Sequence, residues 1–316
     1  FGVACIEEAI ELRQEGIKNP ILLLEGFFTK DELETISNLN LWTAIHSLEQ
    51  INILANSALK KHINVWLKMD TGMHRLGIEP ELYELAFHKL KALRQVNEVV
   101  LMSHFSSADD ILCVDTKKQI HVFERATKNI NAPKSLANSA GTLGHESSHK
   151  DWQRPGIMLY GATPFATPHP IADQLQSVMT LSSEVIAIHH LKKGDGVGYS
   201  KTYICDQNTK VGTVAMGYAD GYPRHAKKGT PVIVNGQRTK ILGRVSMDML
   251  AVDLTHIQGA AVGNTVVLWG PDLPASEVAP YCDTIPYTLF TGVTRRVHKE
   301  YKNILNRDVN AFRKAG

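Results

Sequence analysis

The stretch LWTAIHSLEQINILANSALKKHINVWLKMD, residues 41–70, contains one complete strand–helix–strand unit. Two apolar runs, LWTAIHS and INVWLKMD, flank a segment whose apolar residues recur on one helical face. Ser47 and Gln50 fit the capping box that begins a helix. Since a crossover helix between two short strands connects parallel strands, this stretch predicts a parallel α/β fold.

The same alternation of strand and helix extends from Gly2 to about Tyr160. The apolar runs that qualify as strands are GVAC (2–5), PILLLEG (20–26), LWTAIHS (41–47), INVWLKMD (63–70), EVVLMSH (98–104), PKSLANS (133–139) and GIMLYG (156–161). A closed parallel barrel needs eight strands, and the sequence begins at Phe1 in what reads as a strand. We therefore expect a TIM-like α/β barrel whose first strand and helix are absent from this chain, as in a fragment.

A second type of sequence begins at about Gln176, where short strand-like runs alternate with glycine and proline turns. Asn235-Gly236, set between VIV and QRTKIL, is typical of a two-residue hairpin turn. The prolines and polar residues of ATPHPIADQ (166–174) are typical of a linker. We expect an α/β barrel domain over residues 1–170 and an all-β domain over residues 171–316.

The composition is that of an ordinary globular protein, with 43% hydrophobic and 21% charged residues. Its 34 basic and 32 acidic residues are balanced and form no basic run, which argues against nucleic acid and membrane surfaces as partners. Cys5, Cys113, Cys205 and Cys282 show no metal-binding spacing. We expect no metal site and a reducing, cytoplasmic location.

Charged residues follow two neighbouring strands of the expected barrel, at the carboxyl ends where active sites of such barrels lie. Lys68, Asp70 and Arg75 occur in LKMDTGMHRLG and indicate an anion site; an ordinary solvated loop is the alternative. His104 ends the next strand in LMSHF. A lone histidine there is more often a hydrogen-bonded core residue than a catalyst.

The last two expected strands carry candidates for a phosphate site. Asn138 and Ser139 end LANS, and Arg154, Gly156 and Ile157 lie in WQRPGIMLYG. Backbone N–H groups at a helix start bind phosphate, and glycine allows a ligand to approach closely. The loops after the last two strands form the common phosphate site of such barrels. An ordinary helix cap at Asn138 is the alternative.

Candidates in the β domain are tyrosines and polar residues within glycine-bearing segments. They are Tyr199 in GVGYSKTY, Tyr218 and Asp220 in MGYADGYPR, Met247 and Asp248 in GRVSMDM, and Tyr287 in TIPYTLFTG. Such tyrosines usually pack turns, and a phenol acts as a proton base only where neighbouring groups stabilise its anion. The residues alone therefore indicate a barrel for a phosphate-bearing ligand with an attached β domain.

Taken together, these motifs resemble the alanine racemase family of pyridoxal-phosphate enzymes, which combine an eight-stranded barrel with a C-terminal β domain. The segments that occur in the family's order are FGVACIEEAIELR, LKMDTGMHRLG, MSHFSSAD, LANSAG, WQRPGIMLYG, GYADGYPR and GRVSMDM. They cover essentially the whole chain. The resemblance implies pyridoxal phosphate as cofactor and the interconversion of L- and D-alanine by two bases, for peptidoglycan or for alanine catabolism.

The resemblance also implies catalytic roles for three residues. Tyr199 matches the family's proton acceptor for L-alanine, and His104 matches the neighbour that orients and polarises this phenol. Arg154 matches the arginine that faces the pyridine nitrogen of the cofactor. A positive partner at that nitrogen disfavours its protonation and restrains side reactions such as transamination.

Binding roles follow from the same resemblance. Arg75 matches the residue that contacts the substrate carboxylate and the cofactor hydroxyl, Lys68 the lysine that is often carbamylated to hold it, and Met247 a second substrate-binding residue. The residues that match or adjoin the phosphate cradle or complete the site are Asn138, Ser139, Gly156, Ile157, Tyr287, Tyr218 and Asp248. In the family, Tyr199 and Met247 reach the active site from the partner subunit, which implies a homodimer.

Two departures from the family pattern stand out. The family's catalytic lysine, which bonds to the cofactor and serves as the base for D-alanine, lies in the first barrel strand and is absent from this chain. We therefore expect the chain as given to be inactive as a racemase. At Ser135, many relatives have a histidine that supports the arginine matching Arg154.

Other functions remain open at this point. The same scaffold could racemise serine or a broader set of amino acids, or bind pyridoxal phosphate without catalysis. Retention of Arg75, His104, Arg154 and Tyr199 argues against a simple binding protein. A pyridoxal-phosphate decarboxylase shares the barrel, but the GYADGYPR and SMDM segments favour the racemase.

Overall fold

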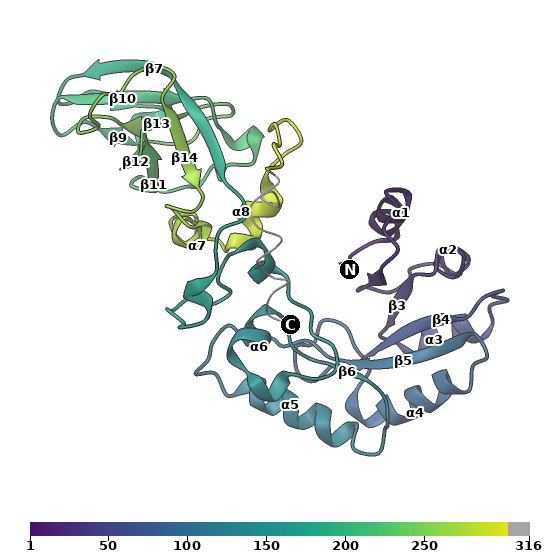
Figure 1. The fold of residues 1–316 in the computed structure, drawn as a ribbon. Coiled ribbons are helices and arrows are strands. Elements are labelled where there is room, and N and C mark those ends of the chain that lie inside the picture. Colours follow the sequence, from purple (N-terminus) through teal and green to yellow (C-terminus); the bar gives the residue numbers. More distant parts are fainter. Residues whose placement is uncertain (303–316) are drawn as a thin grey trace, which may run out of the picture. The chain divides into compact units, whose positions relative to one another are not determined.

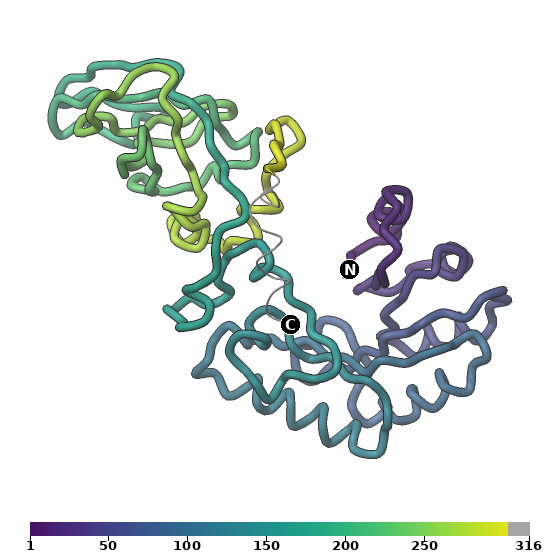
Figure 2. Tube along the Cα trace, viewed as in Figure 1, coloured from purple at the N-terminus to yellow at the C-terminus, as the bar shows by residue number. Residues whose placement is uncertain are grey.

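The computed structural model describes residues 1–302 of the chain. By its internal contacts the chain divides into two compact units, Phe1–Leu175 and Gln176–Gly316. The chain trace shows that each unit is built from one continuous stretch of sequence (Figure 2). Each unit therefore has its own core and can be described by itself.

Unit 1 is a parallel α/β structure (Figure 1). Its strands are β1 (Gly2–Val3), β2 (Leu22–Leu23), β3 (Trp42–Ile45), β4 (Ile63–Lys68), β5 (Val96–Met102) and β6 (Lys134–Ser135). They pair in sequence order and always in parallel, for example Ala44 with Trp66 and Lys68 with Met102. The carboxyl ends of all six strands consequently lie along one edge of the sheet.

Helices connect these strands, as the sequence predicts. They are α1 (Ile6–Gln14), α2 (Glu32–Asn38), α3 (Leu48–Ala55), α4 (Pro80–Lys91), α5 (Asp115–Ala126) and α6 (Ser139–Gly144). The expected start of α3 is confirmed, because Ser47 Oγ accepts a hydrogen bond from Gln50 N at 3.2 Å. Helices α3, α4 and α5 lie on one face of the sheet (Figure 1).

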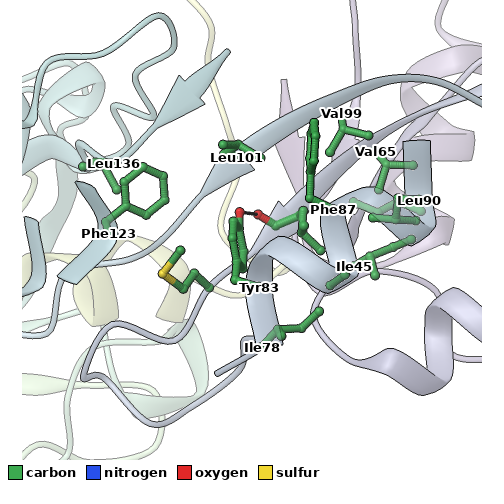
Figure 3. Packing of buried hydrophobic residues seen from close by; sticks show 14 of the residues in the cluster. Ile45, Val65, Ile78, Tyr83, Phe87, Leu90, Val99, Leu101, Phe123 and Leu136 are labelled. Atoms are coloured by element: carbon green, nitrogen blue, oxygen red, sulfur yellow. Dashed lines mark hydrogen bonds between the residues drawn. The ribbon is translucent and has the colours of Figure 1, made fainter. Parts of the chain in front are cut away.

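The main core of unit 1 lies between the sheet and these helices (Figure 3). Ile45, Val65 and Leu101 from the strands pack with Tyr83 and Phe87 from α4. The Tyr83 hydroxyl donates to Leu67 O at 2.6 Å, which satisfies its one polar group inside the core. This packing fixes the helices against the sheet and so fixes where each strand ends.

The position predicted for the seventh strand is wrong. Residues Ile157–Tyr160, expected as a strand, form a turn of 3-10 helix instead. The extended segment next to β6 lies earlier, at Trp152, whose backbone forms a parallel bridge with Ser135. Arg154 N then donates to Ala137 O at 2.9 Å. The apolar run GIMLYG resembles a strand, but the hydrogen-bonding edge of β6 is already taken by the polar residues before it.

Unit 2 contains a closed antiparallel barrel with the strand order β10-β13-β12-β11-β14-β7. Its elements are β7 (Leu181–Leu191), β8 (Gly196–Val197), β9 (Tyr203–Ile204), β10 (Thr209–Val214), β11 (Pro231–Val234), β12 (Gln237–Leu242), β13 (Leu250–Asp253), β14 (Thr265–Trp269), α7 (Ala275–Val278) and α8 (Pro286–Gly292). The predicted hairpin is confirmed: Val234 pairs with Gln237, and Asn235 and Gly236 have φ of 49° and 73°. The all-β texture of the sequence therefore corresponds to a barrel with its own core.

No helix within residues 1–302 is long and apolar enough to cross a membrane.

Two buried tyrosines test how the cores are stabilised. Tyr83→Phe removes the hydrogen bond to Leu67 O and should lower the free energy of unfolding by about 1 kcal/mol. Tyr222 is 1% exposed, and its hydroxyl has no hydrogen-bond partner among the described residues, so Tyr222→Phe should be neutral or stabilising. Thermal melting of both variants measures the difference. Equal losses would contradict the assignment.

Candidate active site

The sheet face of unit 1 opposite the helices carries a cluster of three tryptophans. The ring centroids of Trp42 and Trp66 are 6.4 Å apart, and Trp152 lies 5.5 Å from Trp42 and 5.8 Å from Trp66. Val100 and Met102 of β5 belong to the buried cluster on this face. Since strand side chains alternate, the residue two positions further along each strand lies on the same face, nearer the carboxyl edge.

That next layer contains ionisable side chains instead of apolar ones. His46, Lys68 and His104 follow Ala44, Trp66 and Met102 by two residues. Lys68 is 6% exposed. Its burial, together with the positive charges of Arg75 and Arg154, lowers the pKa of its ammonium group from 10.5 to about 8. Lys68 is thus a buried amine that is partly neutral near neutral pH.

Arg75 is carried by a tight loop that leaves the end of β4 and returns to it. The loop closes where Ile78 N donates to Lys68 O at 2.8 Å. Gly77 has φ of 141°, and a Cβ there would lie 2.3 Å from Asp70 N, so glycine is required. Asp70 Oδ1 accepts from Gly72 N at 2.9 Å and from His74 N at 3.0 Å. The carboxylate therefore shapes the loop rather than pairing with Arg75.

Lys68, Arg75 and His104 line one pocket at this edge, as the sequence predicts for a strand-end site. Among the described residues, Arg75 has no ion-pair partner. Burial and the positive charges of Arg154, Arg75 and Lys68 lower the pKa of the His104 imidazole from 6.5 to about 3. His104 is accordingly a neutral imidazole at physiological pH and can exchange protons without carrying charge.

Arg154 is held by oxygen atoms from two strand ends. Its Nη1 donates to Ser135 Oγ at 2.5 Å, and its Nη2 donates to Ser103 O at 2.6 Å and Leu136 O at 3.1 Å. Burial lowers the pKa of the guanidinium from 12.5 to about 10, so it stays positively charged at neutral pH. Ser135, which replaces the histidine of many relatives, contacts Arg154 directly.

The residues expected around a phosphate lie together in unit 1. Ser139 Oγ accepts from Gly156 N at 2.8 Å and from Met158 N at 3.4 Å. Asn138 caps α6 by accepting from Gly141 N at 2.9 Å, and Ile157 is buried. A Cβ added to Gly156 would meet no atom within 4 Å. This glycine thus leaves open space beside backbone donors.

Two motif segments of unit 2 are joined by an arginine that the sequence analysis missed. Arg296 Nε lies 2.9 Å from Asp220 Oδ1, and its Nη2 lies 2.8 Å from Asp248 Oδ1. Tyr218 N donates to Ser246 O at 3.0 Å. A Cβ at Gly217 would lie 2.2 Å from Met247 O, so the two segments touch at their backbones. Tyr218, Asp220, Met247 and Asp248 therefore form one cluster.

Tyr199 and Tyr287 lie elsewhere in unit 2. Tyr199 is 69% exposed at the start of a 3-10 turn between β8 and β9. Gly198, Ser200 and Lys201 around it have positive φ values of 71°, 58° and 46°. Tyr287 is 43% exposed in the first turn of α8. Both phenols are thus presented to solvent on this unit.

His46 is a further site residue that the sequence analysis missed. It is half-buried, and burial together with the charge of Lys68 lowers the pKa of its imidazole. Its position at the end of LWTAIHS parallels that of His104 at the end of EVVLMSH, and this parallel was a usable signal. Within residues 1–302, no group of three His, Cys, Asp or Glu side chains could hold a metal ion.

A parallel α/β barrel structure with cationic side chains and an imidazole at its strand ends defines an enzyme of the barrel class with an anion-binding site. Comparisons with known proteins name the family. The profile "Alanine racemase, N-terminal domain" matches residues 1–164, and "Alanine racemase, C-terminal domain" matches residues 178–301. The chain belongs to the alanine racemase family.

Individual relatives agree with this assignment. An alanine racemase of Pseudomonas syringae is 52% identical over 301 residues, which are 95% of this chain and 84% of the relative. The crystal structure of the biosynthetic alanine racemase of Pseudomonas aeruginosa matches with a TM-score of 0.93 and 43% identity, over 96% of this chain and 85% of that one. A Bartonella henselae alanine racemase with covalently bound pyridoxal phosphate matches at 0.85 and 28%, over 96% and 84%. Unit 1 thus has the TIM-like α/β fold of this family, and unit 2 its C-terminal β domain.

The state of His104 predicts a pH dependence of stability. Its pKa is about 3 in the folded protein and about 6.5 when unfolded, so below about pH 6.5 the unfolded chain takes up a proton that the folded one refuses. Stability should fall as the pH drops from about 6.5 towards 3. His104→Gln should show a smaller fall in chemical denaturation at a series of pH values. The exposed His121 supplies the control, His121→Gln. Parallel pH dependences of His104→Gln and the wild type would contradict a buried neutral imidazole.

Proposed function

We propose that this protein is a pyridoxal-phosphate-dependent alanine racemase that interconverts L- and D-alanine. The observation that carries the proposal is the joint one: two family profiles span residues 1–164 and 178–301, and the chain retains Arg75, His104, Arg154 and Tyr199. D-alanine would serve peptidoglycan synthesis or alanine catabolism. We expect the enzyme to act in the cytoplasm.

The donor set of unit 1 fits an anionic, phosphate-bearing cofactor. Lys68, Arg75 and Arg154 are close enough to depress the pKa of Lys68, and no carboxylate pairs with Arg75 or Arg154 among the described residues. An anion in this pocket would relieve their mutual repulsion. Ser139, Gly156 and Ile157 would hold the phosphate, with Asn138 beside them and Tyr287 from unit 2 contributing. Pyridoxal phosphate, when bound, supplies an electron sink for the bond broken at the substrate's alpha carbon.

Proton transfer is the part of the reaction assigned to this chain's own residues. The Tyr199 phenolate would remove the alpha proton of L-alanine. His104, a neutral imidazole at physiological pH, would accept the phenol's hydrogen bond and orient it. The base on the opposite face is the family's catalytic lysine, which lies outside the sequence of this chain.

Arg154 would face the ring nitrogen of the cofactor. Its guanidinium remains charged at neutral pH and is fixed by Ser135 Oγ, Ser103 O and Leu136 O. A fixed positive charge would keep the ring nitrogen unprotonated. Arg75 would bind the substrate carboxylate, where a guanidinium can donate two parallel hydrogen bonds.

Unit 2 would complete the site from a second copy of the chain in a homodimer. Tyr199 and Met247 would enter the partner's pocket, with Tyr218 and Asp248 nearby. The exposure of Tyr199, at 69%, is consistent with a side chain that is covered only on assembly.

Tyr199→Phe in the full-length protein tests the catalytic assignment. Loss of the phenol oxygen should reduce L-to-D turnover by at least about 100-fold while cofactor affinity stays nearly constant, because general-base groups contribute about this much. Tyr203→Phe in the same hairpin is the control. Exchange of solvent deuterium into alanine reports proton abstraction directly. Full activity of Tyr199→Phe would remove it from the mechanism.

The same assay separates the rival functions. A binding protein without catalysis would take up pyridoxal phosphate but exchange no deuterium into any amino acid. A serine or broad-specificity racemase would exchange serine as fast as alanine, and a decarboxylase would release carbon dioxide.

Lys68 is the residue that we expect to be carbamylated. Its pKa of about 8 leaves much of the amine neutral, and the neutral nitrogen can attack carbon dioxide and lose a proton to water. The product is an anion that would pair with Arg75. Isotopically labelled bicarbonate should give a carbamate carbon signal in the wild type and none in Lys68→Met. Identical spectra of the two proteins would disprove the modification.

A further inference from the structure

We propose that Gln119 of α5 is a positioning residue that holds the three segments carrying Arg75, His104 and Arg154 in one buried hydrogen-bond network. The inference deepens the proposed function and rests on it for its kinetic readout. Gln119 follows the site in sequence, touches none of the assigned catalytic groups through its own side chain, and lies on the helix side of the strand ends.

The amide of Gln119 is 3% exposed and uses all of its hydrogen-bonding capacity. Its Nε2 donates to Thr71 Oγ1 at 3.1 Å and to His104 O at 3.0 Å. Its Oε1 accepts from Ser106 N at 3.0 Å and from Ser106 Oγ at 3.1 Å. Every one of these four bonds ends on a segment that follows β4 or β5, so one side chain joins the Arg75 loop to the His104 segment.

The network continues from Thr71 to Ser103, which are 8% and 1% exposed. Their hydroxyl oxygens are 2.7 Å apart, and Ser103 Oγ donates to Met69 O at 2.9 Å. Since the only hydroxyl hydrogen of Ser103 goes to Met69 O, Thr71 must be the donor to Ser103. The bonds therefore run in one direction, from Gln119 through Thr71 and Ser103 to Met69, and strengthen one another.

Ser103 also connects this network to Arg154. Its carbonyl oxygen accepts from Arg154 Nη2 at 2.6 Å, and its N–H donates to Ser135 O at 3.2 Å. Arg154 Nη1 in turn donates to Ser135 Oγ. A displacement of residues 103–106 would thus move the acceptor of Arg154, the backbone of His104 and the anchor of the Arg75 loop together.

A purely structural role would be served better by an apolar side chain. Thr116, Gln119, Ile120 and Phe123 form the buried face of α5, where an amide is costly unless it is fully bonded. Leucine has no donor, and glutamate lacks the two N–H groups that reach Thr71 and His104. The choice of an amide is explained by the four bonds to the functional segments.

The test compares Gln119→Leu with Gln95→Leu in the full-length protein. Gln95 is also buried, at 6%, and its Nε2 donates to Ser57 O at 3.0 Å and Ala55 O at 3.4 Å, next to the amino end of β5. Both variants lose a buried amide, but only Gln119→Leu loses contacts to the site. Gln119→Leu should lower kcat by about 10- to 100-fold through misplaced groups, and Gln95→Leu should keep kcat within about twofold at a similar loss of Tm.

Hydrogen exchange of the cofactor-free proteins supplies a readout that does not depend on activity. Gln119→Leu should speed amide exchange in residues 69–78 and 103–106, whereas Gln95→Leu should speed it near residues 55–63. If the protein shows no racemase activity, the proposed function fails, while the exchange pattern still decides whether the network exists. Unchanged exchange in Gln119→Leu, or an equal fall of kcat in both variants, would overturn the proposal.

A second pair of variants covers the case in which Gln119→Leu does not fold. Thr71→Val keeps the shape of the side chain but removes the hydroxyl, and Thr71→Ser keeps the hydroxyl. Thr71→Val should raise KM for alanine and speed exchange in residues 69–78, and Thr71→Ser should restore both. Equal behaviour of the two variants would show that the hydroxyl bonds position nothing.

Discussion

Unbalanced positive charge at one end of the parallel sheet is the constraint on which the site depends. The fall in the pKa of Lys68 from 10.5 to about 8 corresponds to about 3 kcal/mol of unfavourable burial and repulsion felt by its charged form. The one nearby carboxylate, Asp70, is occupied by backbone N–H groups of its own loop. The fold therefore keeps an electrostatic deficit in the pocket, which an anionic ligand or a modification of Lys68 would remove.

The surrounding structure has to keep these like charges in place against their repulsion. Arg154 is fixed by two carbonyl oxygens and the Ser135 hydroxyl, neutral dipoles that orient a guanidinium without cancelling its charge. The Arg75 loop is fixed by its short return to β4 and by Thr71. Neutral hydrogen bonds thus do what salt bridges would otherwise do, and the charge stays available for a ligand.

Unit 2 uses the opposite arrangement. Arg296 binds Asp220 and Asp248 directly, and Gly217 lets the two motif segments approach at their backbones. Here the charges are neutralised within the protein, so the cluster is a rigid support. Tyr199, by contrast, lies in a turn of positive φ angles and is exposed. A rigid frame with one projecting phenol suits a unit that contributes a single side chain to a site.

The sequence by itself determined the features that depend on neighbours along the chain. The strand and helix periods, the Ser47 cap, the Asn235-Gly236 turn and the strand-end positions of Lys68 and His104 follow from local sterics and side-chain alternation. The family's motifs added the identity of the site. The seventh segment was misplaced because GIMLYG has a strand-like composition, whereas pairing with β6 is decided by which residues reach Lys134 and Ser135.

Only the tertiary structure decided how the site residues are held and charged. Gln119 meets Thr71 across 48 residues of sequence, and Arg154 meets Ser103 across 51. Arg296 meets Asp248 in the same non-local way. No local pattern marks such pairs, because a hydrogen bond or a pKa depends on which distant groups the fold brings within a few ångströms and on how much water it excludes.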